Sequence, residues 1–483
     1  MRRRKKSWCP RVLIFATLNP SINSQLIFGE GTPVESSTSR QFTNTETVIS
    51  TECPRLCNCY ETTLNCIQAE LKRIPPTLPT ITQHAEFAQN SISSIQNTDF
   101  RSIKNVVSLD ISENIIETWQ PLTLKLSHAL VNISLNDNKL IEFPAEWHAR
   151  NIQNIDLSKN QLKEVPDYSS LDKVQNLKIG YNPFTNIPQN NKNPFPRNLE
   201  TLEIQCIQGK KLDKFPRLNK LSVLDISCPY NDYGISAKLE IVGNSALVNL
   251  FNLRDLNLAG NRILHIPTNF PPNLLKLDLS NNRIAKINTV CGSSDALFNM
   301  DVMYDSVGGE EDVGVVIPTE VLTSNMTETI NIKHQFSSIA ASIYHLDLSQ
   351  NEINRICVDD FYGMKHLHFL NLSKSQITEF NENSFLFTNS LEVLDISHNR
   401  LTEMRISEIV SLIKLDASYN QIYYVYDIGR ATFPSLESLD LGFNPFRCTC
   451  ENKKFFEFLL EPKGGIRLEG LSGGQGRMAY AQF

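Results

Sequence analysis

Apolar residues recur in this chain in a fixed, asymmetric spacing. In residues 152–166, IQNIDLSKNQLKEVP, the spacing is L-x-x-L-x-L-x-x-N-x-L, with Asn160 in the asparagine position. The L-x-L part predicts a short strand that buries every second side chain. The asparagine amide can donate and accept hydrogen bonds in the turn that follows. One such unit cannot bury its own apolar side, so we expect neighbouring units to stack against it.

The same spacing occurs fourteen times, mostly at steps of 21 to 25 residues. With the first apolar residue counted as position 1, the units begin at Thr82, Val106, Leu130, Ile152, Val174, Leu199, Leu221, Leu253, Leu274, Ile343, Leu367, Leu391, Leu412 and Leu436. Position 9 is asparagine in eleven units: Asn90, Asn114, Asn138, Asn160, Asn182, Asn261, Asn282, Asn351, Asn399, Asn420 and Asn444. This periodicity predicts a solenoid, which grows by adding coils rather than around one closed core.

With these units in register, the chain resembles the leucine-rich-repeat family over roughly residues 53–460. The resemblance implies an α/β solenoid, a horseshoe with a parallel β-sheet on its concave face and cysteine-rich caps. We place leucine-rich repeats at 82–287 and 343–446. Between them, residues 288–342 are interpreted as degenerate repeats with an insertion, since Leu297, Met300 and Val302 fit the spacing only loosely.

The amino-terminal residues are interpreted as a targeting segment and a linker. MRRRKK followed by VLIFATL reads as the basic and apolar regions of a secretory signal within 1–28, with a cytosolic basic tail as the alternative. Residues 29–52 are rich in Ser and Thr without periodicity, which predicts a disordered linker.

Four cysteines, Cys53, Cys57, Cys59 and Cys66, follow within fourteen residues. This density suits two disulfides or a zinc site, although no second cysteine pair or histidine stands nearby. Residues 53–81 resemble the amino-terminal cap of extracellular leucine-rich-repeat proteins. That resemblance implies the pairs Cys53–Cys59 and Cys57–Cys66. Because disulfides persist outside reducing compartments, we expect the chain to be secreted or on the extracellular face of the plasma membrane.

Two further cysteines lie in the middle of the chain, in units that depart from the regular repeat spacing. Cys206 and Cys228 lie 22 residues apart, at the same position of units that lack the asparagine. Adjacent strands lie within the Cα distance of a disulfide, so we predict a Cys206–Cys228 bridge, with two buried thiols as the alternative. Cys291 and Cys357 flank the insertion, and their pairing is a hypothesis without a geometric argument.

The carboxyl end resembles the cysteine cap of the same family, Toll-like receptors included. Residues 447–462 contain CTC and the apolar run FFEFLL, which predicts an amphipathic helix. In the family, Cys448 and Cys450 pair with later cysteines, and this sequence has none, so we expect a partial cap. Either the chain is shortened, or the two thiols stay free or cross-link to another chain. Residues 463–483 read as an irregular tail, and no apolar run in the chain is long enough to cross a membrane.

The concave strands offer the candidate contact residues. Aspartate recurs at position 5, which indicates either an acidic stripe for a basic ligand or a common repeat background. Less generic residues are Tyr181, Tyr344, His345, His368, Phe369, His398, Tyr419 and Phe443, which we assign to variable positions of the concave face. Candidate glycosylation sites are Asn132, Asn325 and Asn371, of which Asn132 and Asn371 should project from concave strands.

No catalytic, phosphate-binding or metal-binding motif was found, so we expect a protein that is not an enzyme and needs no cofactor or metal. The net charge of -6 argues against nucleic acid as a partner. We expect binding of a protein or glycan, in receptor-type signalling or cell adhesion, and a homodimer is a further expectation. The alternatives are a secreted matrix-associated binding protein without signalling, and an intracellular scaffold.

Overall fold

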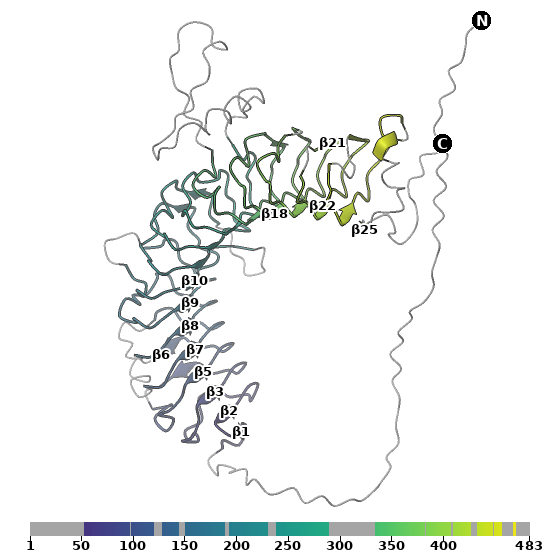
Figure 1. Cartoon of the computed structure of the whole chain (residues 1–483). Coiled ribbons are helices and arrows are strands. Elements are labelled where there is room, and N and C mark those ends of the chain that lie inside the picture. The colour runs from purple at the N-terminus through teal and green to yellow at the C-terminus, as the bar shows by residue number, and fades with distance from the viewer. Residues whose placement is uncertain are drawn as a thin grey trace, which may run out of the picture.

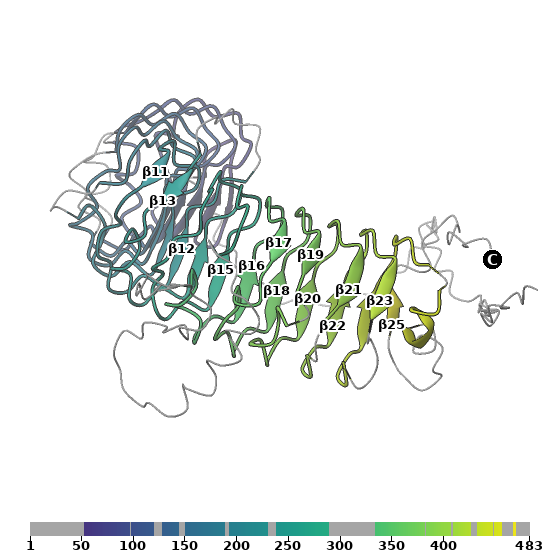
Figure 2. The same cartoon turned by 90° about the horizontal axis from the view of Figure 1, so that it is seen from above.

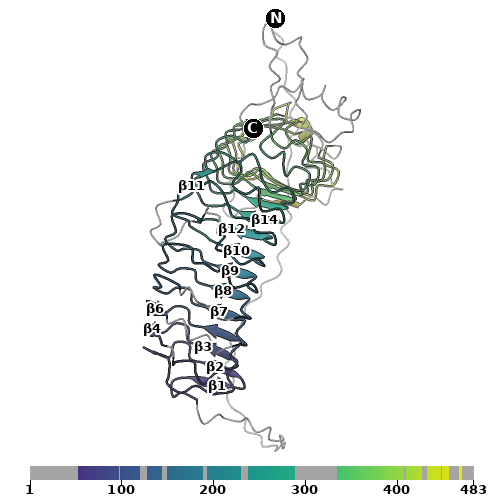
Figure 3. The same cartoon turned by 90° about the vertical axis from the view of Figure 1, so that its left-hand side faces the viewer.

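The computed structural model describes residues 53–455, with gaps at 97, 120–127, 144–149, 189–192, 230–237, 289–333, 382, 407–408, 427–431 and 448, and also residues 467–469. The described chain is a curved solenoid, and the strands of one long sheet lie along its inner side (Figure 1). The first coils are stacked in the order of the sequence (Figure 3). The predicted leader and linker, 1–28 and 29–52, lie outside the described residues.

Each of the fourteen units contributes one three-residue strand, at its positions 3–5. These strands are β3 (His84–Glu86), β5 (Ser108–Asp110), β7 (Asn132–Ser134), β8 (Asn154–Asp156), β9 (Asn176–Lys178), β10 (Thr201–Glu203), β12 (Val223–Asp225), β14 (Asp255–Asn257), β15 (Lys276–Asp278), β16 (His345–Asp347), β18 (Phe369–Asn371), β20 (Val393–Asp395), β22 (Lys414–Asp416) and β24 (Ser438–Asp440). Successive strands pair in parallel, and equivalent positions lie opposite each other, as in β8 with β9. The middle residue of each strand is buried and its two neighbours are accessible, so the predicted alternation is confirmed.

The asparagine at position 9 joins neighbouring coils. The Asn160 Nδ2 donates to the carbonyl oxygens of Leu135, at 3.0 Å, and Leu157, at 3.1 Å. The Asn160 Oδ1 accepts from the Leu140 N–H at 3.0 Å. Buried backbone groups of two coils are thereby paired where water cannot reach them, as the sequence predicted.

The outer side of the solenoid carries turns and short parallel sheets of two strands (Figure 2). These sheets are β4 (Ser94–Ile95) with β6 (Thr118–Trp119), β11 (Lys211–Leu212) with β13 (Ile241–Val242), β17 (Arg355–Ile356) with β19 (Glu379–Phe380), and β21 (Glu403–Arg405) with β23 (Tyr424–Tyr426). Inside, phenylalanine rings of successive coils stack, for example Phe361 on Phe385 at 5.9 Å. In the described ranges only residues 453–455 are helical, and no helix there has the length and apolarity that a bilayer crossing requires.

The amino-terminal cap is an antiparallel hairpin of β1 (Asn58–Tyr60) and β2 (Thr63–Asn65), and β2 pairs with β3. Disulfides join Cys53 to Cys59 and Cys57 to Cys66, so the pairing implied by the family resemblance is confirmed. The zinc alternative is wrong, because all four sulfur atoms are in disulfides. The hairpin covers the open end of the solenoid core.

In the middle of the sheet, β15 pairs directly with β16 in register. The Asn351 Nδ2 donates to the Leu279 carbonyl at 2.9 Å, so the asparagine contact also continues across this junction. The coil that begins at Leu274 is therefore followed in the sheet by the coil that begins at Ile343. The predicted degenerate repeat at Leu297, Met300 and Val302 lies outside the described residues.

The expectation of an irregular tail is wrong at Arg467–Glu469. These residues form β25, which pairs in parallel with β24 and places Leu468 opposite Leu439. The physical reason is that β24 would otherwise leave a row of backbone groups unpaired at the sheet edge. The glycine-rich surroundings concealed the short R-L-E segment that pairs with this edge.

Candidate binding face

The eight candidate contact residues do not all lie on concave strands, which corrects the prediction. Only His345 and Phe369 are strand residues, in β16 and β18. Tyr344 and His368 immediately precede these strands. The remaining residues are at position 8, in the turn that follows a strand: Tyr181, His398, Tyr419 and Phe443.

The structure brings four of them together across β16 and β18. The ring of Tyr344 stacks on His368 at 4.3 Å, and the ring of His345 is parallel to Phe369 at 4.1 Å. Burial lowers the pKa of His345 below its ordinary value, although the charge of Asp347 acts in the opposite direction. Burial therefore favours the neutral form of the His345 imidazole, whose ring stacks on Phe369.

Three others form a continuous stack over the last three coils, which we call the aromatic row: His398, Tyr419 and Phe443. Their ring centroids are 4.2 Å and 4.1 Å apart, and the interplanar angles are small. Tyr419 is 45% exposed and Phe443 is 61% exposed. Stacked aromatic side chains that remain this accessible are typical anchors of binding surfaces.

The backbone fixes the spacing of the aromatic row. Its three residues have φ between 53° and 57°, in the left-handed region that non-glycine residues seldom occupy. The N–H groups of His398 and Tyr419 donate to the carbonyl oxygens of Ser418 and Gly442 in the next coil, each at 2.9 Å. Because these bonds repeat along the solenoid, successive side chains at position 8 are held at the separation of adjacent coils. Tyr181 has the same conformation (φ 57°) but lies far from the row, in the turn after β9.

The aspartates at position 5 support the structural interpretation rather than the acidic-stripe one. In eight coils the Oδ1 atom of this aspartate accepts the N–H of position 7, as Asp347 does from Ser349 at 2.8 Å. The aspartates are Asp110, Asp156, Asp225, Asp278, Asp347, Asp395, Asp416 and Asp440. Each one closes the turn that leads from the strand to position 8.

The two described glycosylation candidates project from concave strands, as expected. Asn132 is in β7, and its Oδ1 accepts a hydrogen bond from Asn154 Nδ2. Asn371 is in β18, and its Nδ2 donates to Asp347 Oδ2 at 3.1 Å. Asn325 lies outside the described residues. Their occupancy by glycans stays a prediction.

The predicted bridge between Cys206 and Cys228 is confirmed, with a Cα–Cα distance of 4.4 Å. The spacing of the cysteines did not predict the accompanying lysine. Lys238 Nζ donates to the carbonyl oxygens of Cys228, at 2.8 Å, and Gly260, at 2.6 Å. The disulfide thus joins two coils that lack the asparagine, and Lys238 joins the second of them to the next coil.

The repeat spacing did not predict a second surface group, which we call the arginine–tyrosine cluster: Arg405, Tyr423, Tyr424, Tyr426 and Arg447. The guanidinium of Arg405 lies 4.0 Å from the ring centroid of Tyr426, and that of Arg447 lies 4.5 Å from Tyr423. The alternation in YYVY, residues 423–426, was the available signal, because it predicts two tyrosines on one face of a strand.

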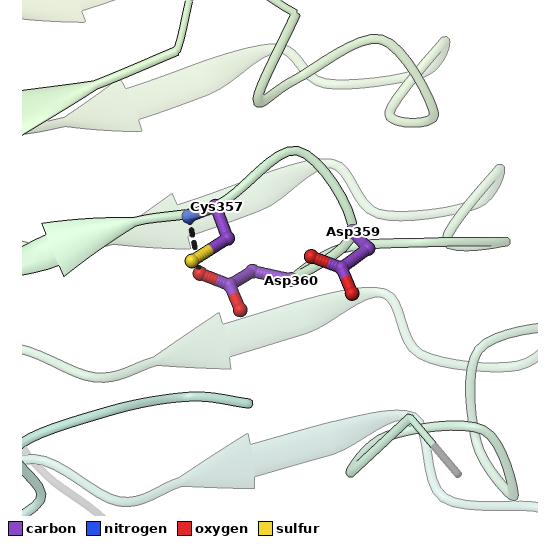
Figure 4. A group of neighbouring side chains, drawn as sticks. All are labelled: Cys357, Asp359 and Asp360. Atoms are coloured by element: carbon purple, nitrogen blue, oxygen red, sulfur yellow. Dashed lines mark hydrogen bonds between the residues drawn. The ribbon is translucent and has the colours of Figure 1, made fainter. Parts of the chain in front are cut away.

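One buried group of side chains has atoms close enough to suggest a metal site: Cys357, Asp359 and Asp360 (Figure 4). Cys357 is disulfide-bonded, so its sulfur is not available as a thiolate ligand. Its partner lies outside the described residues, and the Cys291–Cys357 pairing stays a prediction. The Asp360 carboxylate accepts the N–H of Cys357 at 2.7 Å and that of Asn288 at 3.2 Å. These contacts make the group a structural anchor of its coil.

Comparison with known proteins agrees with this geometry. A family model described as leucine rich repeat matches residues 341–401. Leucine-rich repeat-containing protein 3 of Danio rerio is 34% identical over 108 residues, which are 21% of this chain and 41% of that protein. Keratocan of Mus musculus is 22% identical over 63% of this chain and 73% of its own length. A leucine-rich-repeat protein of Leptospira interrogans superposes with a TM-score of 0.56 at 20% identity, covering 81% of this chain and 84% of that one. The chain spans less than half the length of the first curated relatives it matches.

The in-register coils and their asparagine contacts define the class of the molecule as a parallel-sheet solenoid. The family match over residues 341–401 narrows this class: the fold is a leucine-rich-repeat solenoid with a disulfide-bonded amino-terminal cap.

Proposed function

We propose that this protein is an extracellular recognition protein, and that it binds a protein partner through the aromatic row in cell adhesion or receptor-type signalling. The observation that carries the proposal is the exposed stack of His398, Tyr419 and Phe443 on three rigid coils. Tyrosine and phenylalanine are enriched at the centres of protein interfaces. Because the backbone already fixes the row, little conformational entropy is lost when a partner binds.

The extracellular location is supported by the cysteines. Three disulfides join described residues, and Cys357 is in a further one. Such a set is typical of proteins that fold in an oxidising compartment. An intracellular scaffold would not be expected to keep these bonds.

The proposal is tested by secretion of the full chain from cultured animal cells, followed by titration of the labelled protein onto cells in flow cytometry. We expect saturable binding, which weakens about tenfold or more in H398A/Y419A/F443A, since anchor residues contribute about 1–2 kcal/mol each. The matched control is Y60A/I141A/F251A, which removes three exposed but scattered apolar side chains and should bind normally. A photocrosslinking residue at position 419 then captures the partner for identification.

Two results would contradict the proposal. One is a chain that stays inside the cell with reduced cysteines. The other is a triple variant of the aromatic row that is folded, as judged by its thermal transition, and binds cells as tightly as the control variant.

A further inference from the structure

The outer sheet formed by β21 and β23 presents arginines above tyrosine rings. Tyr424 and Tyr426 lie on either side of the buried Val425, and the parallel register places Arg405 beside Tyr426. The rings of Tyr424 and Tyr426 are 6.2 Å apart. Arg447, from the last coil, reaches back so that its guanidinium lies 5.8 Å from the Tyr424 ring and donates to the Tyr424 hydroxyl at 3.3 Å. The two guanidinium groups therefore belong to one continuous surface.

These two arginines carry positive charge that the surrounding residues balance only in part. The Arg405 Nε lies 3.7 Å from Glu403 Oε1, and both side chains are about half exposed. A loose, exposed pair of this kind contributes little binding energy. Within the described chain, Arg447 has no carboxylate within 4.0 Å. Both guanidinium groups lie over rings, and apart from Arg405 Nε and Arg447 Nη1 their N–H groups have no partner among the described residues, so they can donate to an anion with two oxygens in one plane.

The backbone beside β23 is closed to a peptide. The Val425 N–H donates to Asn452 Oδ1 at 2.8 Å, and the Tyr423 carbonyl accepts from Asn452 Nδ2 at 2.6 Å. An extended peptide that adds to a sheet edge needs these backbone groups unpaired. A ligand on this surface must instead be recognised by side chains, through charge and through contact with the rings.

We propose that the arginine–tyrosine cluster binds a sulfated glycan chain. Sulfate esters stay ionised throughout the physiological pH range, and their paired oxygens match the donor fork of a guanidinium. The half-buried tyrosine rings offer apolar contact to the C–H groups of sugar rings. A chain with repeating anionic groups can offer one sulfate to Arg405 and another to Arg447. The inference does not depend on the aromatic row, which is a separate set of residues.

Heparin is the probe for this proposal. The secreted full chain is passed over immobilised heparin at low and physiological salt, and we expect binding that weakens as salt rises. The variant R405Q/R447Q should bind about tenfold or more weakly, because it loses both charged contacts. E403Q should bind about twofold more tightly, since a like charge beside the sulfates is removed.

The matched control is R355Q. Arg355 lies on the equivalent outer strand β17, pairs with Glu379 at 3.4 Å and is stacked on no ring among the described residues. It should keep the wild-type affinity for heparin. The H398A/Y419A/F443A variant should also keep the wild-type affinity for heparin. A failure of the heparin proposal can therefore be distinguished from a failure of the proposed cell-binding function. If R405Q/R447Q does not fold, R405K/R447K keeps the charge without the fork and should still bind less tightly than wild type.

Three outcomes overturn the proposal. One is a folded R405Q/R447Q chain with unchanged heparin affinity. Another is equal binding to desulfated heparin, which would remove the role of sulfate. The third is equally tight binding to poly-L-glutamate, which would identify acidic peptides as the ligand class instead.

Discussion

At the scale of single residues, Asp360 combines deep burial with two hydrogen bonds from backbone N–H groups. Burial is the main cause that raises its pKa to about 7, and the nearby Asp359 raises it further, while the N–H donors oppose the change. A carboxyl group whose pKa is higher in the folded than in the unfolded state favours folding only while it is protonated. Its contribution to stability is therefore complete below the pKa of the unfolded state. That contribution is lost as pH rises through about 7.

The first prediction is that Asp360 makes stability fall between pH 5 and pH 8. We expect the ionisation of this group to lower the free energy of unfolding by about 2–3 kcal/mol over that interval. His334 and His345 have lowered pKa values and act in the opposite direction, so the useful quantity is the difference between wild type and D360N. Urea unfolding at both pH values measures it. A D360N chain with the same pH dependence as wild type would refute the assignment.

At the scale of elements, the coil is the unit, and most of its features could be predicted because they follow from local spacing. The L-x-L strand, the asparagine at position 9 and the Cys206–Cys228 bridge depend on residues one repeat apart, which lie on adjacent coils. The position of the aromatic residues was harder to predict. Position 8 turns out of the sheet in a left-handed conformation, and alternation alone does not reveal this. The hydrogen bond from Lys238 to the Cys228 carbonyl depends on the path of one long side chain. The spacing of residues along the chain does not encode such a path.

The second prediction concerns the coils of β10 and β12, which the disulfide connects. The C206A/C228A variant should lose about 2–4 kcal/mol of stability, because the bridge restricts the unfolded chain. The loss should appear as faster amide hydrogen exchange in β10 and β12 rather than along the whole sheet, since each coil contacts only its neighbours. C450A, which removes an exposed free thiol, is the control and should exchange normally. Uniformly faster exchange in all coils would contradict this picture.

At the scale of the whole molecule, the sheet is continuous although the sequence is interrupted between its two sets of repeats. The Gln335 N–H donates to Asn288 Oδ1 at 3.1 Å, so the described ends on either side of residues 289–333 meet directly. With β15 paired to β16, the solenoid does not depend on the interruption for its register.

The third prediction follows from this contact. Replacing residues 293–331 with a Gly/Ser linker of about six residues, a common connection length, should leave the fold intact. A shorter connection changes closure entropy by only about 0.6 kcal/mol per halving of its length. We expect the same circular dichroism spectrum and a melting temperature within a few degrees of wild type. An aggregated product, or two separate thermal transitions, would show that these residues hold the two sets of repeats together.

Position 8 is left-handed in thirteen of the fourteen coils, and only Gly260 among these thirteen is a glycine, which has a consequence for how such a protein can diversify. Lys159, Tyr181, Lys374, His398 and Phe443 all occupy this conformation, and none of them is glycine. The conformation is therefore imposed by the surrounding backbone bonds and tolerates any of these side chains. A new partner can be accommodated by exchanging single residues along this line, coil by coil, while the scaffold beneath stays unchanged.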